Sequence, residues 1–249
     1  MISGKRVIAA MLTALMAVTF TANTAVSVYA TGVTATENAQ TIDAQSTDAQ
    51  ALTPEEQKAQ ELQQVYDMPV ESNGYKDWPQ GPGTYGEAGI VMEVGTGAIL
   101  YAKNIDAHEY PASITKVLTA LVALENGQLT DNVTFSHDSV AFLQRGDSSV
   151  GLKEGNVITL DQAMHAMLLA SANEAAYAIG ESVGVNAGHD YNWFIEQMNS
   201  RCKELGGENS NFANTNGLHD PNHYTCARDM ALIGRELFKH PEFFQIVQT

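Results

Sequence analysis

The sequence predicts an α+β domain that begins with a β-hairpin and continues as a series of helices. Residues 88–94 and 98–104, AGIVMEV and AILYAKN, have strand character and flank a Gly-Thr-Gly turn in which glycine accepts a positive φ. After Pro111, apolar side chains recur at helical spacing in one segment after another. Because one hairpin cannot cover a core of this size, we expect more strands than these two.

The first helix after the hairpin is expected to start at Ser113 and to stop at Gly127, buried because apolar residues surround it. Short extended pieces and turns follow it. Thr159 and Gln162 form a capping box for the next helix. A later helix is capped by Asp190. The later predicted helices cover residues 159–170, 173–184, 190–205, 225–239 and 241–249.

Residues 1–30 have the pattern of a secretory signal peptide. A cationic start, MISGKR, precedes an apolar run and a small residue at Ala30, which predicts cleavage after that residue. An uncleaved membrane anchor is the alternative, but Thr13, Thr19 and Thr21 interrupt the apolar run and leave it short for a membrane span. We therefore expect an exported protein.

Residues 31–64 are rich in Thr, Ala, Gln, Asp and Glu, and they include no aromatic residue. A segment of this composition cannot bury enough apolar surface to fold, so we expect a disordered linker. Aromatic residues, glycines and apolar runs appear from residue 65 onward. Residues 65–249 are therefore expected to form the folded domain.

The chain is strongly acidic, with a formal net charge of −16. Removing the leader removes Lys5 and Arg6 and no acidic residue, which makes the charge −18. Binding to a phosphate backbone relies on Lys and Arg, and this surface would repel it. The composition therefore argues against a nucleic-acid partner.

Cys202 and Cys226 are the only cysteines, and two alternatives stay open for them. An exported chain can form a disulfide, but both residues also lie in or beside helical segments that suit a small buried thiol. His219 and His223 lie in a polar loop without a third ligand at a suitable spacing, so they are interpreted as ordinary loop histidines. No metal and no other cofactor is predicted.

Ser113 and Lys116 are the first candidate catalytic pair. Their i, i+3 spacing places both side chains on one helical face, where a hydroxyl can pass its proton to an amine. Burial and the helix dipole would lower the pKa of the lysine, and the Ser113 N–H could stabilise an oxyanion. The alternative is an ordinary helix cap and a surface charge. The same spacing recurs at Ser200 and Lys203 inside a polar helix, so the spacing alone is not specific.

Ser171 and Asn173 supply a second motif, Ser-Ala-Asn, at a corner between two predicted helices. The serine hydroxyl could relay a proton to a leaving amine, and the amide could contact both the substrate carbonyl and Lys116. By itself this motif is also compatible with a plain N-cap pair. Ser113, Lys116, Ser171 and Asn173, found in this order after a hairpin, are together more specific than either motif.

From about Glu87 onward the chain resembles the D-alanyl-D-alanine carboxypeptidases, the low-molecular-mass penicillin-binding proteins of the serine peptidases. The resemblance rests on EAGIVMEVGTGAILYAKN, PASITKVLTALVALENG, LLASANEAA and MNSRCKELGGENSNFANTNGLHDPNHYTCARDMALI. It implies the transpeptidase-like fold of serine β-lactamases and penicillin-binding proteins, an antiparallel sheet flanked by helices plus a helical subdomain. Glu174 stands where Asp is more usual in the family, which we interpret as a minor departure.

The resemblance also implies an activity and a location. Ser113 would be the acyl-ester nucleophile, Lys116 its general base, and Ser171 and Asn173 the second catalytic element. The substrate would be the peptidoglycan pentapeptide stem, which loses its terminal D-alanine, and β-lactams would acylate the enzyme. The protein would work in the bacterial cell envelope, with no cofactor and no nucleic acid.

One family motif is missing: no lysine of the chain is followed by Thr-Gly or Ser-Gly, although the family carries Lys-Thr-Gly on a later strand. We therefore expect that the chain is truncated at its C-terminal end and lacks the later sheet strands. Two alternatives follow for its function. One is a serine β-lactamase of the same fold; the other is a non-catalytic envelope protein that only binds peptidoglycan.

Overall fold

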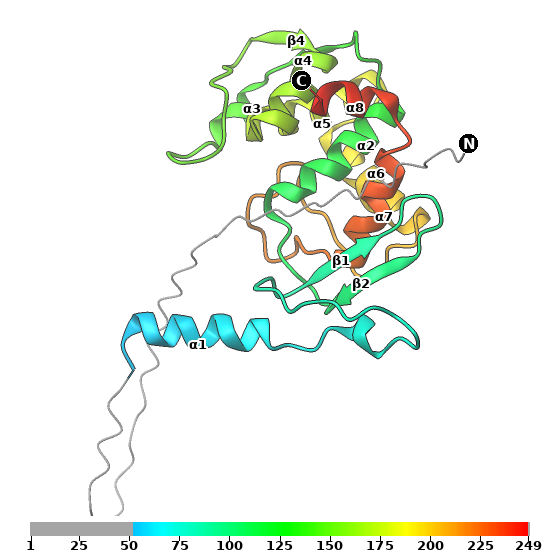
Figure 1. Cartoon of the computed structure of the whole chain (residues 1–249). Coiled ribbons are helices and arrows are strands. Elements are labelled where there is room, and N and C mark those ends of the chain that lie inside the picture. Colours follow the sequence, from blue (N-terminus) through cyan, green and yellow to red (C-terminus); the bar gives the residue numbers. More distant parts are fainter. Residues whose placement is uncertain (1–51, 249) are drawn as a thin grey trace, which may run out of the picture. The chain divides into compact units, whose positions relative to one another are not determined.

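The computed structural model describes residues 52–248. The predicted signal peptide of residues 1–30 and the first part of the predicted linker, residues 31–51, lie outside the described residues. The chain divides into two units, residues 1–57 and residues 58–249. Only residues 52–57 of the first unit are described, and the second unit carries the sheets, the core and the candidate site (Figure 1).

Helix α1 (Pro54–Tyr66) occupies the described end of the predicted linker. The expectation of a disordered segment is wrong here. Thr53 and Glu56 form a reciprocal cap, with the Glu56 N–H donating to Thr53 Oγ1 and the Thr53 N–H donating to Glu56 Oε2. Glu, Gln, Ala, Lys and Leu dominate the helix and are good helix formers. None of its residues is buried, so apolar content could not have predicted it.

The predicted hairpin is confirmed, in a shorter form. Strand β1 (Gly89–Met92) pairs antiparallel with β2 (Ile99–Lys103). Lys103 is fully buried at the end of β2, and its Nζ donates to the backbone carbonyls of Val65, at 2.6 Å, and Thr84, at 2.7 Å. A buried ammonium needs such acceptors. Lys103 therefore fastens the preceding segment to the hairpin.

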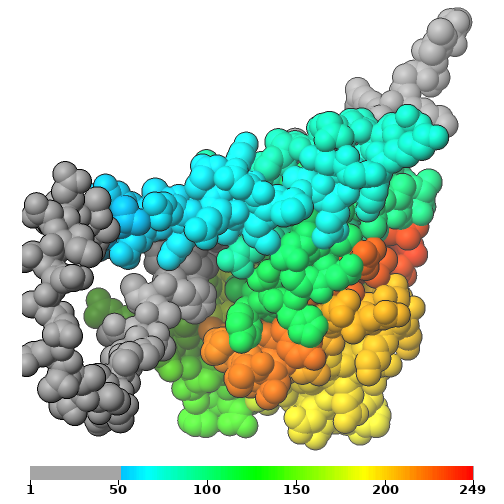
Figure 2. Space-filling model, turned by 90° about the horizontal axis from the view of Figure 1, so that it is seen from below, coloured from blue at the N-terminus to red at the C-terminus, as the bar shows by residue number. Residues whose placement is uncertain are grey.

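Residues 65–84 cover the outer edge of β2, and Figure 2 shows this cyan segment lying across the green hairpin. The Ala102 N–H donates to Ser72 Oγ at 3.2 Å, and the Trp78 indole N–H donates to the Leu100 carbonyl at 2.8 Å. These side chains take the place of a neighbouring strand. An edge strand with such partners is protected from pairing with another chain.

Two further strands are present in residues 52–248, but they do not extend the hairpin. Strand β3 (Asn132–Thr134) pairs antiparallel with β4 (Val157–Thr159) in a separate two-stranded sheet. The helices are η1 (Glu71–Gly74), η2 (Ala112–Ile114), α2 (Thr115–Asn126), α3 (His137–Ala141), α4 (Leu160–Leu169), α5 (Asn173–Asn186), α6 (Tyr191–Glu204), α7 (Ala227–Leu237) and α8 (Pro241–Val247).

Helix α2 lies at the centre of the second unit, packed against α4, α5, α6 and α7 (Figure 1). Its burial confirms the interpretation of an apolar helix without an exposed face. The fully buried side chains around it form one continuous core, which includes Leu118, Leu121, Leu160, Met164, Met167, Ile179, Phe194, Met198 and Ile233. The motif that begins α2 is therefore built on a rigid element.

The predicted helix caps are also present. Thr159 and Gln162 make the expected capping box, and Asp190 accepts the Trp193 N–H at 2.9 Å. The helix expected at residues 225–239 is shorter, because Thr225 pairs with the backbone of Glu109 instead. Between residues 52 and 248, no helix is both long enough and apolar enough to cross a membrane.

Cys202 and Cys226 are both free thiols, and both are buried. Of the two alternatives left by the sequence, the structure has the buried thiols. Burial raises the pKa of each thiol to about 11, and the charge of Asp229 acts in the same direction.

Candidate active site

Ser113 lies in the short helix η2, just before α2 begins, so the predicted helix start is displaced by a tight turn. Ala112 has a positive φ of 46°, which is uncommon for a residue with a Cβ. The hydroxyl of Ser113 is 3.1 Å from Lys116 Nζ. The N-cap residue of α2 is Ile114 and accepts no side-chain hydrogen bond, so Ser113 is not an ordinary cap.

Lys116 is 3% exposed, and its Nζ has three oxygen neighbours. They are Ser113 Oγ at 3.1 Å, Asn173 Oδ1 at 2.8 Å and the backbone carbonyl of Asn216 at 2.7 Å. The last two can only accept a hydrogen bond. A neutral amine has two N–H groups, which these two oxygens occupy, and its lone pair then faces Ser113. In its neutral form the amine would therefore direct its lone pair at the serine hydroxyl.

The environment of Lys116 favours that neutral form. Burial lowers the pKa of the ammonium from 10.5 to about 8, and the negative charge of Glu174 opposes the shift. A substantial fraction of the side chain is then unprotonated just above neutral pH. This is the condition that a lysine must meet to act as a general base.

Ser171 and Asn173 come to the same place from the corner between α4 and α5. Ser171 has a positive φ of 56°, and its hydroxyl donates to Ser113 Oγ at 3.0 Å. Ala172, not Ser171, is the N-cap residue of α5, and it makes no side-chain cap bond. The alternative of a plain cap pair does not fit these contacts. Ser171, Ser113 and Lys116 form one continuous chain of hydrogen bonds, and Asn173 holds its far end.

Two left-handed residues therefore flank Ser113, one before it in sequence and one across the site. Such backbone conformations cost about 1 to 3 kcal/mol each and persist only where the surroundings impose them. They concentrate at functional sites. The second Ser-x-x-Lys pair lacks any comparable setting, since Ser200 makes a 3.5 Å contact with Glu204 and Lys203 is exposed.

The part played by residues 213–218 was not predictable from a local sequence pattern. This loop supplies the carbonyl of Asn216 to Lys116, and the Thr119 hydroxyl donates to the Thr215 carbonyl at 2.7 Å. Both contacts use backbone atoms of the loop, which any residue type would provide. Only the glycine at position 217, with a φ of 82°, is a visible trace of the geometry in the sequence.

His223 was also missed as part of the site. Its Nδ1 accepts the Ala213 N–H at 3.0 Å, which places the ring proton on Nε2, 2.7 Å from Thr115 Oγ1. Burial lowers the pKa of this imidazole to about 4. His219 packs edge-on against Tyr110. No group of three or more His, Cys, Asp or Glu in residues 52–248 is arranged to hold a metal ion.

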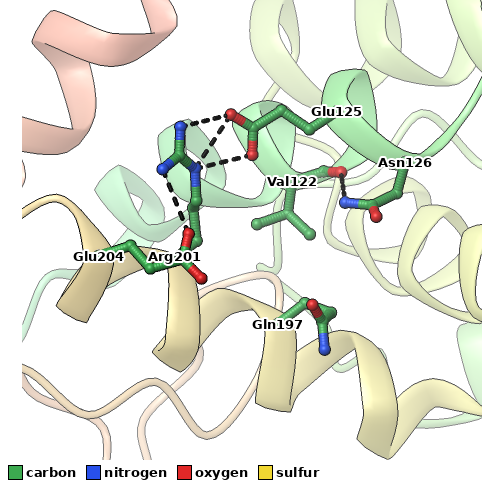
Figure 3. A pocket seen from close by; sticks show the side chains of 6 residues that line it. All are labelled: Val122, Glu125, Asn126, Gln197, Arg201 and Glu204. Carbon is green, nitrogen blue, oxygen red and sulfur yellow. Dashed lines mark hydrogen bonds and ion pairs between the residues drawn. The ribbon is translucent and has the colours of Figure 1, made fainter.

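Two cavities in residues 52–248 lie near helices that carry or adjoin the site. One, of about 550 Å³, adjoins the site through Asn216 and is lined by His137, Asp138, Ala141, Phe142, Tyr177, Asn214, Asn216 and Leu218. The other, of about 300 Å³, lies between α2 and α6 and holds none of the four predicted site residues. Figure 3 shows that Arg201 pairs there with Glu125 and Glu204. The charged residues that line this cavity therefore already pair with one another.

Comparison with known proteins gives a consistent result. The family model described as D-alanyl-D-alanine carboxypeptidase matches residues 79–249. Among curated relatives, the chain is 32% identical over 168 residues to the carboxypeptidase DacF of Bacillus subtilis (strain 168), covering 66% of this chain and 41% of the relative. It is 34% identical over 163 residues to DacA of Haemophilus influenzae, covering 63% and 40%. The chain thus spans about two fifths of the length of these relatives.

Solved structures agree with the sequence matches. A mutant of the Streptomyces K15 DD-transpeptidase superimposes with a TM-score of 0.60 at 30% identity, over 65% of this chain and 64% of that one. Penicillin-binding protein 5 of Haemophilus influenzae gives 0.60 at 32% identity, over 68% and 49%. These likenesses confirm the predicted transpeptidase-like fold for the matched part of the chain.

Proposed function

Because the chain belongs to the D-alanyl-D-alanine carboxypeptidase family, we propose that it carries the acylation site of a serine-type D-Ala-D-Ala carboxypeptidase. One observation carries the proposal. Lys116 Nζ, buried and with a lowered pKa, lies 3.1 Å from the hydroxyl of the exposed Ser113. A buried amine beside an accessible hydroxyl is the arrangement needed to make serine a nucleophile.

In the first step, Lys116 takes the proton of the Ser113 hydroxyl as Oγ attacks the carbonyl carbon of the penultimate D-alanine. The carbonyl electrons move to its oxygen. The Ser113 N–H belongs to the short helix η2, directly before α2, and is the group that stabilises the oxyanion. Asn216 and Asn173 keep two N–H groups of Lys116 engaged throughout.

In the second step, the tetrahedral intermediate loses the terminal D-alanine. The proton held by Lys116 reaches the leaving amine through the hydroxyl of Ser171, which already contacts Ser113 Oγ. An ester on Ser113 remains. Water then attacks this ester with Lys116 as the base, which releases the shortened peptide and restores the Ser113 hydroxyl.

The acyl side of the substrate has room in the cavity next to Asn216. Phe142, Tyr177 and Leu218 give this cavity an apolar lining, and Asp138 stands among its lining residues. An extended peptide attached to Ser113 fits such a cleft, because ligand pockets combine apolar walls with a few polar groups. We assign to it the peptidoglycan stem peptide, and we assign β-lactams to the same site as acylating inhibitors.

The proposal includes export to the bacterial cell envelope. It rests on the leader pattern of residues 1–30 and on the kind of substrate that the family name implies. Peptidoglycan lies outside the cytoplasmic membrane, so an enzyme that trims it must cross that membrane.

A labelling experiment tests the nucleophile. The protein is incubated with benzylpenicillin, digested and analysed by mass spectrometry. We expect a penicilloyl adduct on the peptide that contains Ser113, lost in Ser113→Ala and kept in the matched control Ser200→Ala, which alters the other Ser-x-x-Lys pair. An adduct at another residue would refute the assignment.

A second assay separates the alternatives. A peptide ending in D-Ala-D-Ala should release D-alanine, and the penicilloyl adduct should persist for minutes or longer. Rapid turnover of a chromogenic β-lactam would favour the serine β-lactamase alternative instead. Binding of peptidoglycan without any adduct would favour the non-catalytic alternative.

A further inference from the structure

Glu174 is a fully buried carboxylate in the first turn of α5, directly after Asn173. Its Oε1 accepts three hydrogen bonds from one loop: from the Ser149 hydroxyl at 2.7 Å, the Val150 N–H at 2.8 Å and the Gly151 N–H at 3.2 Å. Consecutive N–H groups that converge on one oxygen form an anion-binding nest. A single carboxylate oxygen therefore determines the conformation of residues 149–151.

The same loop is joined to the site by its backbone. The Asn173 N–H donates to the Ser148 carbonyl at 2.9 Å, and the Asn173 side chain accepts from Lys116 Nζ at 2.8 Å. A displacement of the loop would thus move the backbone of the residue that orients Lys116. Glu174 therefore binds residues 149–151 of the loop, while Ser148 of the same loop binds the backbone of Asn173.

The second carboxylate oxygen of Glu174 has no hydrogen-bond partner in the described residues and is fully buried. Burying such a group costs free energy, so its retention calls for an explanation. Glu174 directly follows Asn173, whose side chain binds Lys116 Nζ, and the negative charge of Glu174 acts on Lys116 against the effect of burial. His223 contacts Thr115, the residue before Lys116. Its imidazole is neutral above about pH 5, so at higher pH it adds no positive charge that would offset the charge of Glu174.

We propose that Glu174 is a positioning residue for acyl transfer: it clamps residues 149–151, next to the Ser148 carbonyl that binds Asn173, and its negative charge acts on Lys116. This inference rests on the proposed function. It also revises the interpretation of Glu174 as a minor departure from the Asp usual in the family. The longer side chain of Glu reaches three donors of the loop from the first turn of the helix.

Three substitutions separate the clamp from the charge. Glu174→Gln keeps an acceptor oxygen for the loop but removes the charge. Glu174→Asp keeps the charge but withdraws it from the loop by one methylene. Glu174→Ala removes both. Asp229→Asn is the matched control, because Asp229 is also buried, also has one oxygen without a partner, and binds a different loop at Asn209 and Ser210.

Two measurements need no catalytic activity. Hydrogen exchange of the Val150 and Gly151 amides should accelerate at least tenfold in Glu174→Ala, clearly in Glu174→Asp and only about twofold in Glu174→Gln. The pH titration of Lys116, followed by NMR of carbon-labelled lysine, should shift to lower pH by about half a unit or more in Glu174→Gln and Glu174→Ala. Glu174→Asp and Asp229→Asn should leave it unchanged.

The acylation rate by benzylpenicillin then gives the functional reading. In each variant, the pH at which the acylation rate is half-maximal should follow the pKa of Lys116. The maximal rate at high pH should be lower only in Glu174→Ala and Glu174→Asp, which weaken the hold on the loop. Unchanged amide exchange in Glu174→Ala would overturn the clamp, and an unchanged Lys116 titration in Glu174→Gln would overturn the role of the charge. If the unaltered protein is not acylated at Ser113, the proposed function fails, while exchange and titration still decide the inference about Glu174.

Discussion

Gly217 lies directly against the backbone of Ala112: a Cβ at position 217 would be 1.7 Å from the Ala112 carbonyl oxygen. The loop that supplies the Asn216 carbonyl to Lys116 thus packs in direct contact with the turn that contains Ser113. The two halves of the site are fitted to each other through backbone atoms. Neither half can shift without disturbing the other.

This contact predicts that Gly217→Ala damages both stability and acylation. The new methyl group cannot be accommodated without moving Ala112, and the φ of 82° at position 217 adds strain. We expect a loss of about 3 kcal/mol in the free energy of unfolding and a fall of at least tenfold in the acylation rate. Denaturant titration and adduct mass spectrometry would measure them.

Gly188→Ala is the control for backbone strain alone. Gly188 has nearly the same φ, 83°, but its Cβ would meet no atom within 4 Å. We expect a loss of only about 1 kcal/mol there. Equal losses in the two variants would contradict the argument that the contact with Ala112 matters.

Acylation of Ser113 should depend on the protonation state of Lys116. Since burial lowers the pKa of this lysine to about 8, the acylation rate should rise with pH and level off above that value. Lys116→Arg keeps the positive charge but cannot lose its proton, so we expect a fall of about a thousandfold or more at every pH. A pH-independent rate in the unaltered protein would argue against lysine as the base.

Whether a contact in the site could be predicted from the sequence depends on how far apart its two residues lie in the chain. Ser113 and Lys116 are neighbours on one helical turn, so their meeting follows from spacing, although their chemical roles stay proposals. The hydrogen bond between Thr115 and His223 joins residues far apart in the chain, and no local pattern reports it. The Asn216 carbonyl is invisible in a sequence because every residue has one.

The same reasoning explains the fold. The hairpin and helices after residue 85 were predictable because alternation and helical spacing record which faces are buried. Helix α1 was not, because it buries nothing and depends on a capping pair and intrinsic propensity. The covering of β2 by residues 65–84 was also hidden, since it uses single side chains such as Ser72 and Trp78 in place of a strand.

His223 should make the protein sensitive to acid. Its folded-state pKa of about 4 lies below the unfolded value of 6.5, so the unfolded chain binds more protons between these values. The free energy of unfolding should therefore decrease as the pH falls from 6.5 to 4, by about 2 to 3 kcal/mol from this residue. Protonation would also cost the hydrogen bond from Ala213, because imidazolium cannot accept it.

Substitution isolates this contribution. His223→Gln cannot titrate, so the dependence of unfolding on pH between 4 and 6.5 should become shallower. His137→Gln is the matched control, since the side chain of His137 is 73% exposed. Denaturant titrations at several pH values measure the slope, and an identical slope in His223→Gln and the unaltered protein would sink the assignment.

The two cysteines should be inert in the folded protein. Cys202 is 3% exposed and Cys226 is fully buried, and a pKa of about 11 leaves only about one thiol in a thousand ionised at pH 8. We expect no reaction with Ellman's reagent within minutes under native conditions and the release of two equivalents after denaturation without reductant. Rapid native labelling would contradict the burial, and fewer than two thiols after denaturation would reveal a disulfide. Because the thiolate is the reactive form, burial of the two thiols should slow their oxidation in the folded protein.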